Sequence, residues 1–144
     1  MLRFRTITPH DNEYRDVFDL REEILRKPLG LSLHNEDLSN EVSEHILVAE
    51  EEGNIVACLI LTPGDGNMLQ LRQMAVAEAR QGQHIGRQLV EYAEQFAWNK
   101  GYEQIILHAR MVAKGFYEKL GYVQQGGIFT EVNIPHIEMI KNKP

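Results

Sequence analysis

Hydrophobic and polar residues alternate with a period of two over Leu2–Ile7, and this pattern predicts a first β-strand. Apolar residues then recur at spacings of three and four between Val17 and Leu25, which predicts a helix with one apolar face that ends before Pro28. The segment Lys27–Ser43 is polar with scattered leucines, so we expect a long loop that contains one short helix.

Two apolar runs, Ile46–Ala49 and Ile55–Leu61, flank a polar stretch that contains Gly53-Asn54. Such a stretch between two apolar runs predicts a β-hairpin. A third extended segment, Met68–Val76, follows a cluster of Pro, Gly, Asp and Asn that favours a turn. The three segments are expected to form successive antiparallel strands.

The second half of the chain alternates between helical and extended patterns. An amphipathic helix should begin near Ile85 and end at Lys100-Gly101, and Val112–Leu120 should form another helix with a left-handed cap at Gly121. Between them, the continuous apolar run Ile105–Leu107 is typical of a strand that is buried on both sides.

Two closing strands are predicted near Tyr122–Gln125 and Ile137–Ile140, joined across Gly126-Gly127 and a loop that contains Pro135. The resulting order, β-α-β-β-β-α-β-α-β-β, predicts an α+β fold with a mixed, mostly antiparallel central sheet and helices on both faces. At 144 residues with 43% hydrophobic content, residues 1–144 are expected to form a single domain.

Composition narrows the classes of partner. The formal net charge of -6 gives no reason to expect nucleic-acid binding, and no apolar segment is long enough to indicate membrane insertion or a leader, so a cytoplasmic protein is expected. The lone Cys58 is interpreted as a small buried hydrophobe, and no grouping of His, Cys, Asp and Glu has the spacing of a metal site.

A polar, glycine-containing turn separates the strand Met68–Val76 from the helix that begins near Ile85. Unpaired backbone N–H groups converge at such a helix N-terminus, where the helix dipole also favours negative charge. The turn therefore indicates a phosphate site, although two glycines between a strand and a helix more often form a simple connection. The residues of the turn are Gln81, Gly82, Gln83, His84, Ile85, Gly86 and Arg87.

This turn, followed one strand later by Phe116–Tyr122, resembles the GNAT superfamily of N-acetyltransferases. The turn of that superfamily reads Gln/Arg-x-x-Gly-x-Gly/Ala, and His84 stands where the middle glycine is usual. The resemblance implies that acetyl-CoA is the cosubstrate, without a metal. It also implies that the turn Gln81–Arg87 binds the pyrophosphate and that the main chain of Met74, Ala75 and Val76 contacts the pantetheine arm.

Tyr117 matches the superfamily tyrosine whose hydroxyl lies near the thioester sulfur and protonates the leaving thiolate. Without that context, a tyrosine at helical spacing is more often a packing residue. The resemblance therefore implies a catalytic role for Tyr117.

Four segments together resemble the glyphosate N-acetyltransferase branch and related bacterial acetyltransferases: Gln70–Ala75, Ala109-Arg110, Tyr117–Tyr122 and Pro135–Ile137. The resemblance implies that His136 is the general base. It also implies that arginines bind the anionic groups of a small amine-bearing acid, and the candidates are Arg72, Arg110, Arg26 and Arg21.

General chemistry agrees with these roles. Histidine suits the removal of a proton from an amine near neutral pH, and guanidinium groups bind carboxylate or phosphonate through paired hydrogen bonds. The alternative for His136 is a structural strand histidine, and for any single arginine it is a surface salt bridge. His108 could face the site, but a satisfied core histidine is the favoured interpretation.

The sequence thus predicts an acetyl-CoA-dependent N-acetyltransferase that acetylates a small acidic amine, of amino-acid or amino-phosphonate type, by direct attack in a ternary complex. Two alternatives stay open: a peptide or protein amine acetyltransferase, and a non-catalytic acyl-CoA-binding module. The natural acceptor and the oligomeric state, including a homodimer, are not decided by the sequence.

Overall fold

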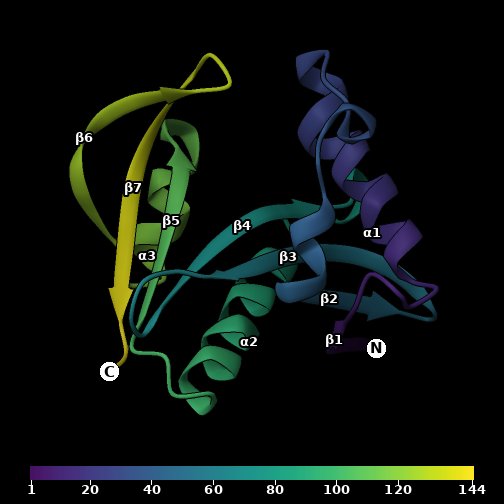
Figure 1. Ribbon diagram of the computed structural model, residues 1–144, viewed down its shortest axis with the longest axis horizontal. Helices are drawn as coiled ribbons and strands as arrows, with labels where there is room; N and C mark the ends of the chain where they lie inside the picture. Colours follow the sequence, from purple (N-terminus) through teal and green to yellow (C-terminus); the bar gives the residue numbers. More distant parts are fainter.

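A computed structural model describes residues 1–144. A seven-stranded sheet has the order β1-β2-β3-β4-β5-β7-β6, and every neighbouring pair is antiparallel except β4 and β5 (Figure 1). This is the predicted mixed, mostly antiparallel sheet. The strands are β1 (Leu2–Ile7), β2 (His45–Glu51), β3 (Asn54–Pro63), β4 (Met68–Val76), β5 (Gln104–Arg110), β6 (Val123–Glu131) and β7 (Ile134–Asn142).

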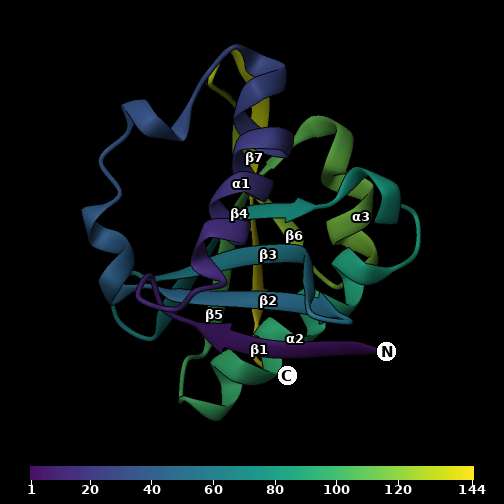
Figure 2. The same ribbon diagram turned by 90° about the vertical axis from the view of Figure 1, so that its right-hand side faces the viewer.

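Helices cover both faces of the sheet. The larger core lies under α2 and α3, and the smaller core, which includes Val17, lies under α1 on the other face. Figure 2 shows α1 in front of the middle strands. The helices are α1 (Tyr14–Arg21), α2 (Ile85–Asn99) and α3 (Lys114–Lys119). No helix is long and apolar enough to cross a membrane.

Short helical turns connect the main helices and strands. The predicted long loop contains three 3-10 turns where the sequence indicated one short helix, and a wide π-helical turn continues α1 up to Arg26. These turns are η1 (Glu22–Arg26), η2 (Lys27–Leu29), η3 (Leu33–Asn35), η4 (Ser39–Ser43), η5 (Glu78–Arg80) and η6 (Met111–Ala113).

The parallel strands β4 and β5 separate halfway along their length. Their pairing runs only from Met68 opposite Gln104 to Leu71 opposite Leu107. Just beyond that point Gln73 has a left-handed backbone (φ 57°), and the register with β3 shifts there. A bulge bends the strand that contains it. The second half of β4 therefore diverges from β5 (Figure 1), and the main chain of residues 72–76 has no partner on β5.

Two predictions about strands are wrong in detail. Strand β5 is not buried on both sides, because Ile105, Leu107 and Ala109 are buried whereas the alternate residues Ile106, His108 and Arg110 are only partly covered. The closing hairpin turns at Val132-Asn133, not at Gly126-Gly127. Both turn residues have positive φ, whereas the two glycines lie inside β6 where its pairing with β7 is irregular.

Arg21 is buried beneath α1, with an exposed fraction of 1%. Its two terminal nitrogens each lie 2.9 Å from an oxygen of Glu41, and Tyr14 also donates a hydrogen bond to that carboxylate. Arg21 lies four residues after the buried Val17, so the apolar face of the helix turns it toward the sheet. The suggestion that Arg21 binds an anionic substrate is therefore wrong, because its guanidinium is enclosed and already paired.

We expect Arg21→Met to destabilise the protein by about 3 to 5 kcal/mol, because Glu41 would stay buried without its partner. The matched control is Arg15→Met on the exposed side of the same helix, which should change stability by about 0.5 kcal/mol or less. Urea unfolding of both variants checks this prediction. Equal stability of the two variants would contradict the structural role of Arg21.

Candidate active site

A cavity of about 550 Å³ lies where β4 and β5 diverge. Its walls come from the helical segment 24–31 with the nearby Glu36, the middle of β4, the end of β5, the region of η6 and α3, and the β6–β7 hairpin. Arg26, Arg72, Arg110, Tyr117 and His136 all line this cavity. The fold thus brings five of the six proposed catalytic and substrate-binding residues together, and only Arg21 lies elsewhere.

Two of the three arginines in the cavity are already paired with carboxylates. Arg26 Nε lies 2.6 Å from Glu36 Oε2, and its other nitrogens contact Gln73 Oε1 and the carbonyl of Leu25. Arg72 Nη1 lies 3.1 Å from Glu44 Oε2. The protein's own glutamates therefore balance the charges of Arg26 and Arg72.

Arg110, the last residue of β5, differs from the other two arginines. It is partly exposed, and its side chain makes no hydrogen bond or ion pair within the chain. Its cross-strand partner on β7 is His136, so the two side chains lie on the same face of the sheet. A guanidinium without a partner beside a histidine can bind an anion next to a basic nitrogen.

The backbone orients the imidazole of His136. Its Nδ1 lies 2.7 Å from the carbonyl oxygen of Ile134, and a carbonyl can only accept, so Nδ1 carries the hydrogen. Nε2 of the neutral ring therefore has a free lone pair, and it lies 3.7 Å from Glu131 Oε2. Phe129 stacks against the ring with a centroid distance of 6.0 Å. This arrangement can accept a proton at Nε2.

Glu131 was not singled out by the sequence, yet it lines the same cavity. Its carboxylate also lies 3.1 Å from Nδ1 of His108, whose Nε2 is 3.5 Å from Glu138. The favoured interpretation of His108 as a core histidine is wrong, because its side chain lines the cavity. Strand alternation could have indicated this, because His108 and Arg110 are two residues apart and share one face.

Tyr117 lies on α3 at the inner end of the cavity and is 7% exposed. Edge-to-face contacts with Phe116 and Tyr122 fix its ring. Burial raises the pKa of its hydroxyl to about 12, so Tyr117 stays protonated throughout the neutral range. A free thiol has a pKa near 8.5, which makes this phenol a weaker acid than the thiol of CoA. The hydroxyl is therefore better suited to donate a hydrogen bond to a thiolate than to give up its proton.

The turn before α2 presents a row of free donors. No backbone N–H from Gly82 to Arg87 donates a hydrogen bond within the chain, and no side chain caps the helix. His84 has a left-handed backbone (φ 63°), the conformation that glycine would adopt most easily at this place of the motif. The 15-residue α2 adds its dipole at this end, so the turn fits a pyrophosphate group.

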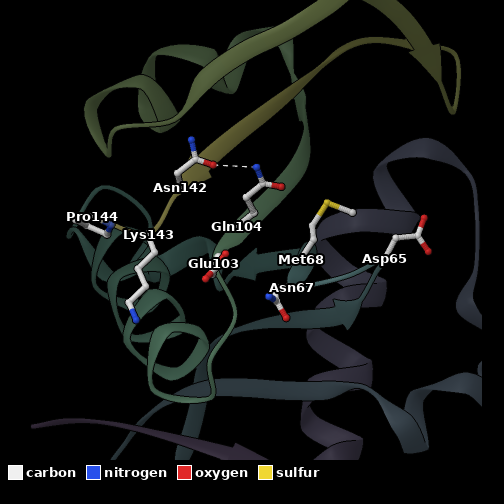
Figure 3. A pocket seen from close by; sticks show the side chains of 8 residues that line it. All are labelled: Asp65, Asn67, Met68, Glu103, Gln104, Asn142, Lys143 and Pro144. Atoms are coloured by element: carbon white, nitrogen blue, oxygen red, sulfur yellow. Dashed lines mark hydrogen bonds between the residues drawn. The ribbon is translucent and has the colours of Figure 1, made fainter.

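A second hollow, of about 520 Å³, lies at the opposite end of β4 and β5 (Figure 3). Its lining is mostly acidic and amide side chains, among them Asp65, Asn67 and Glu103, and Gln104 Nε2 donates a hydrogen bond to Asn142 Oδ1 on the neighbouring strand. It contains no arginine or histidine, and no group of three or more His, Cys, Asp and Glu in the structure could hold a metal ion. None of the predicted site residues lines this hollow.

Comparisons with known proteins agree with this geometry. A family model described as an acetyltransferase (GNAT) domain matches residues 42–124. The uncharacterized N-acetyltransferase YjcF of Bacillus subtilis (strain 168) is 30% identical over 94% of this chain and 97% of its own. The chain belongs to the GNAT acetyltransferase family. It is thus an acetyl-CoA-dependent N-acetyltransferase, and the non-catalytic alternative is set aside.

A second curated protein is similar in sequence, and solved structures are similar in fold. The uncharacterized N-acetyltransferase YitI of Bacillus subtilis (strain 168) is 29% identical over 98% of this chain and 96% of its own. Among solved structures, an acyl-CoA N-acyltransferase from Pseudomonas aeruginosa superposes with a TM-score of 0.85 at 23% identity, covering 98% of this chain and 99% of that one.

An aminoglycoside 6'-N-acetyltransferase, solved in complex with coenzyme A, superposes with a TM-score of 0.81 at 19% identity and covers 97% of this chain and 96% of its own. At these identities the solved structures support the fold alone. The family model and the relative YjcF show the GNAT family, and they do not confirm the glyphosate branch within it.

Two substitutions of Gly86, one small and one larger, test whether the turn binds CoA. A Cβ added at Gly86 would lie 3.6 Å from side-chain atoms of Met74, Val76 and Phe116, which is ordinary contact. Gly86→Ala should therefore bind CoA nearly as the parent does. In Gly86→Val the further methyl groups have no room, so the turn must move, and we expect at least a tenfold loss of CoA affinity by calorimetry, corresponding to about 1.4 kcal/mol.

Thermal melting of both variants separates local disturbance from unfolding. If the folded Gly86→Val protein binds CoA with unchanged affinity, the cofactor does not use this turn.

Proposed function

We propose that this acetyltransferase acetylates the amine of a small acidic molecule. The observation that carries the proposal is the meeting of Arg110, which has no partner, with the oriented imidazole of His136 in one cavity. An anion on Arg110 would hold the acceptor, and its amine would lie beside the basic nitrogen.

His136 acts as the general base in this proposal. Amines with a pKa of 9 to 10 are about 1% neutral or less at pH 7, so a proton must be removed before attack. The free lone pair on Nε2 can accept that proton, while the Ile134 carbonyl keeps the ring in the correct tautomer. Glu131 near Nε2 would then stabilise the imidazolium.

Acetyl-CoA supplies an activated thioester, and the transfer forms a C–N bond while the C–S bond breaks. The free N–H groups of residues 82–87 would hold the pyrophosphate, and the main chain of Met74, Ala75 and Val76, which does not pair with β5, would contact the pantetheine arm. Tyr117 would donate a hydrogen bond to the sulfur as negative charge develops there. Arg72, whose charge Glu44 balances, is 40% exposed and would offer the acceptor only its remaining N–H donors.

A panel of acceptors tests the substrate class. Thiol release from acetyl-CoA should be faster with acidic amines than with polyamines or lysine peptides. Arg110→Ala should raise the Michaelis constant for the acidic amine roughly 30-fold or more while leaving that for acetyl-CoA within about twofold, because a charged contact worth about 2 kcal/mol or more is lost. Arg15→Ala, on an exposed helix face, is the matched control.

If polyamines or peptides are better acceptors than every acidic amine, the substrate proposal is wrong and the peptide-amine alternative takes its place. The family assignment does not depend on this result.

The pH–rate profiles of variants should distinguish the roles of His136 and Tyr117. His136→Ala should lower turnover by about 100-fold or more and remove the acid limb of the parent's pH–rate profile. Tyr117→Phe should lower turnover by about 100-fold to 1,000-fold, as expected when one donor in the transition state is lost. Since the raised pKa of Tyr117 keeps it protonated below about pH 12, the profile of this variant should keep the parent's shape up to pH 10.

Steady-state rates from pH 6 to 10 provide the measurement. A fall of less than threefold in Tyr117→Phe would return this residue to a packing role, and an unchanged acid limb in His136→Ala would remove the proposed base.

A further inference from the structure

We propose that the cavity selects an α-amino acid with a single carboxylate and an uncharged side chain, and that Arg110 holds this carboxylate while Glu131 receives the ammonium. This inference rests on the proposed function and narrows its substrate class. It distinguishes an amino acid from an amino-phosphonate or a dicarboxylate.

The charge balance of the cavity is the first argument. Glu36 and Glu44 neutralise Arg26 and Arg72, so these arginines offer no unbalanced positive charge to an acceptor. Arg110 is the one arginine of the cavity without a carboxylate partner. A single carboxylate is matched by this guanidinium. A second negative charge would be desolvated in the cavity without a counterion, which is costly.

Glu131 provides the matching negative site. Its two oxygens face the ring nitrogens of His108 and His136, at 3.1 and 3.7 Å. An ammonium bound to Glu131 would therefore lie beside Nε2 of His136, the atom that must accept its proton. The carboxylate attracts the charged form of the amine, and the imidazole can then neutralise it in place.

Glu131 is held by an unusual turn. It pairs with Ile134 across the hairpin, and the two residues between them, Val132 and Asn133, both have positive φ. A β-branched residue rarely adopts this conformation, and such strained positions cluster at functional sites. The turn also carries the Ile134 carbonyl that orients His136, so one short segment sets both the proposed amine site and the base.

The close placement of the proposed carboxylate site and amine site favours an α-amino acid. Arg110 and His136 are direct cross-strand neighbours, so the sites for the carboxylate and for the amine are adjacent. An α-amino acid carries both groups on one carbon. Apart from Arg26, the nearby wall from the helical segment 24–31 is apolar. Ile24, Leu25 and Leu29 line the cavity there and would contact an uncharged side chain.

A comparison of five acceptors on the wild-type protein tests this inference. The acceptors are leucine, methionine, aspartate, 2-amino-3-phosphonopropionate and 6-aminohexanoate, assayed by thiol release from acetyl-CoA. We expect kcat/KM for leucine or methionine to exceed that for each of the other three by at least tenfold. A higher kcat/KM for aspartate or the phosphonate overturns the inference but leaves the proposed function in place. Absence of activity with all five acceptors overturns both.

Glu36→Gln is expected to gain activity toward the phosphonate, a result that misfolding would not produce. It should free the charge of Arg26 and raise kcat/KM for the phosphonate relative to leucine by about tenfold. Asp37→Asn, a charge change in the same loop whose carboxylate contacts only Ser39, should leave that ratio within twofold. An unchanged ratio in Glu36→Gln overturns the charge-balance argument.

Glu131→Gln tests the amine site. It should raise the Michaelis constant for leucine at least tenfold while leaving that for acetyl-CoA within twofold, because only the acceptor carries an ammonium. An unchanged Michaelis constant for leucine overturns the assignment of Glu131.

Discussion

The separation of β4 from β5 is the constraint on which the site depends. Four residue pairs join the strands, after which the bulge at Gln73 bends β4 away. If the pairing continued, the main chain of residues 72–76 would be satisfied by β5, and no cavity would separate the strands. Cys58 and Ala75, on β3 and β4, lie in the smaller core next to this bulge, so packing under α1 stabilises the bent conformation.

The two faces of the sheet contribute different functional groups to the cavity between β4 and β5. The turn before α2 and the ring of Tyr117 come from the face of the sheet that carries the larger core, whereas Arg26 and its apolar neighbours come from the end of the α1 segment. The β6–β7 hairpin adds His136 and Glu131. Because these parts come from distant places in the sequence, the rigid sheet fixes their relative positions.

Periodicity made the strands, the helix α2 and the phosphate turn predictable, because burial of one face dictates those patterns locally. The position of Arg21 was also readable in principle, four residues after the buried Val17, but its partner Glu41 lies 20 residues away and no local pattern indicates such a pair. The hairpin turn was placed wrongly because glycines usually supply positive φ, whereas Val132 and Asn133 adopt it here.

The net charge of the cavity is the property that the sequence pattern predicts least well. The pattern of three arginines and a histidine suggests a strongly cationic site for an acid. Glu36 and Glu44 come from the polar segment before β2, and only the fold brings them to Arg26 and Arg72. Each such pair removes one positive charge from the site without changing the arginine pattern. Two GNAT proteins with the same arginines can therefore prefer acceptors of different charge, according to which arginine lacks a carboxylate partner.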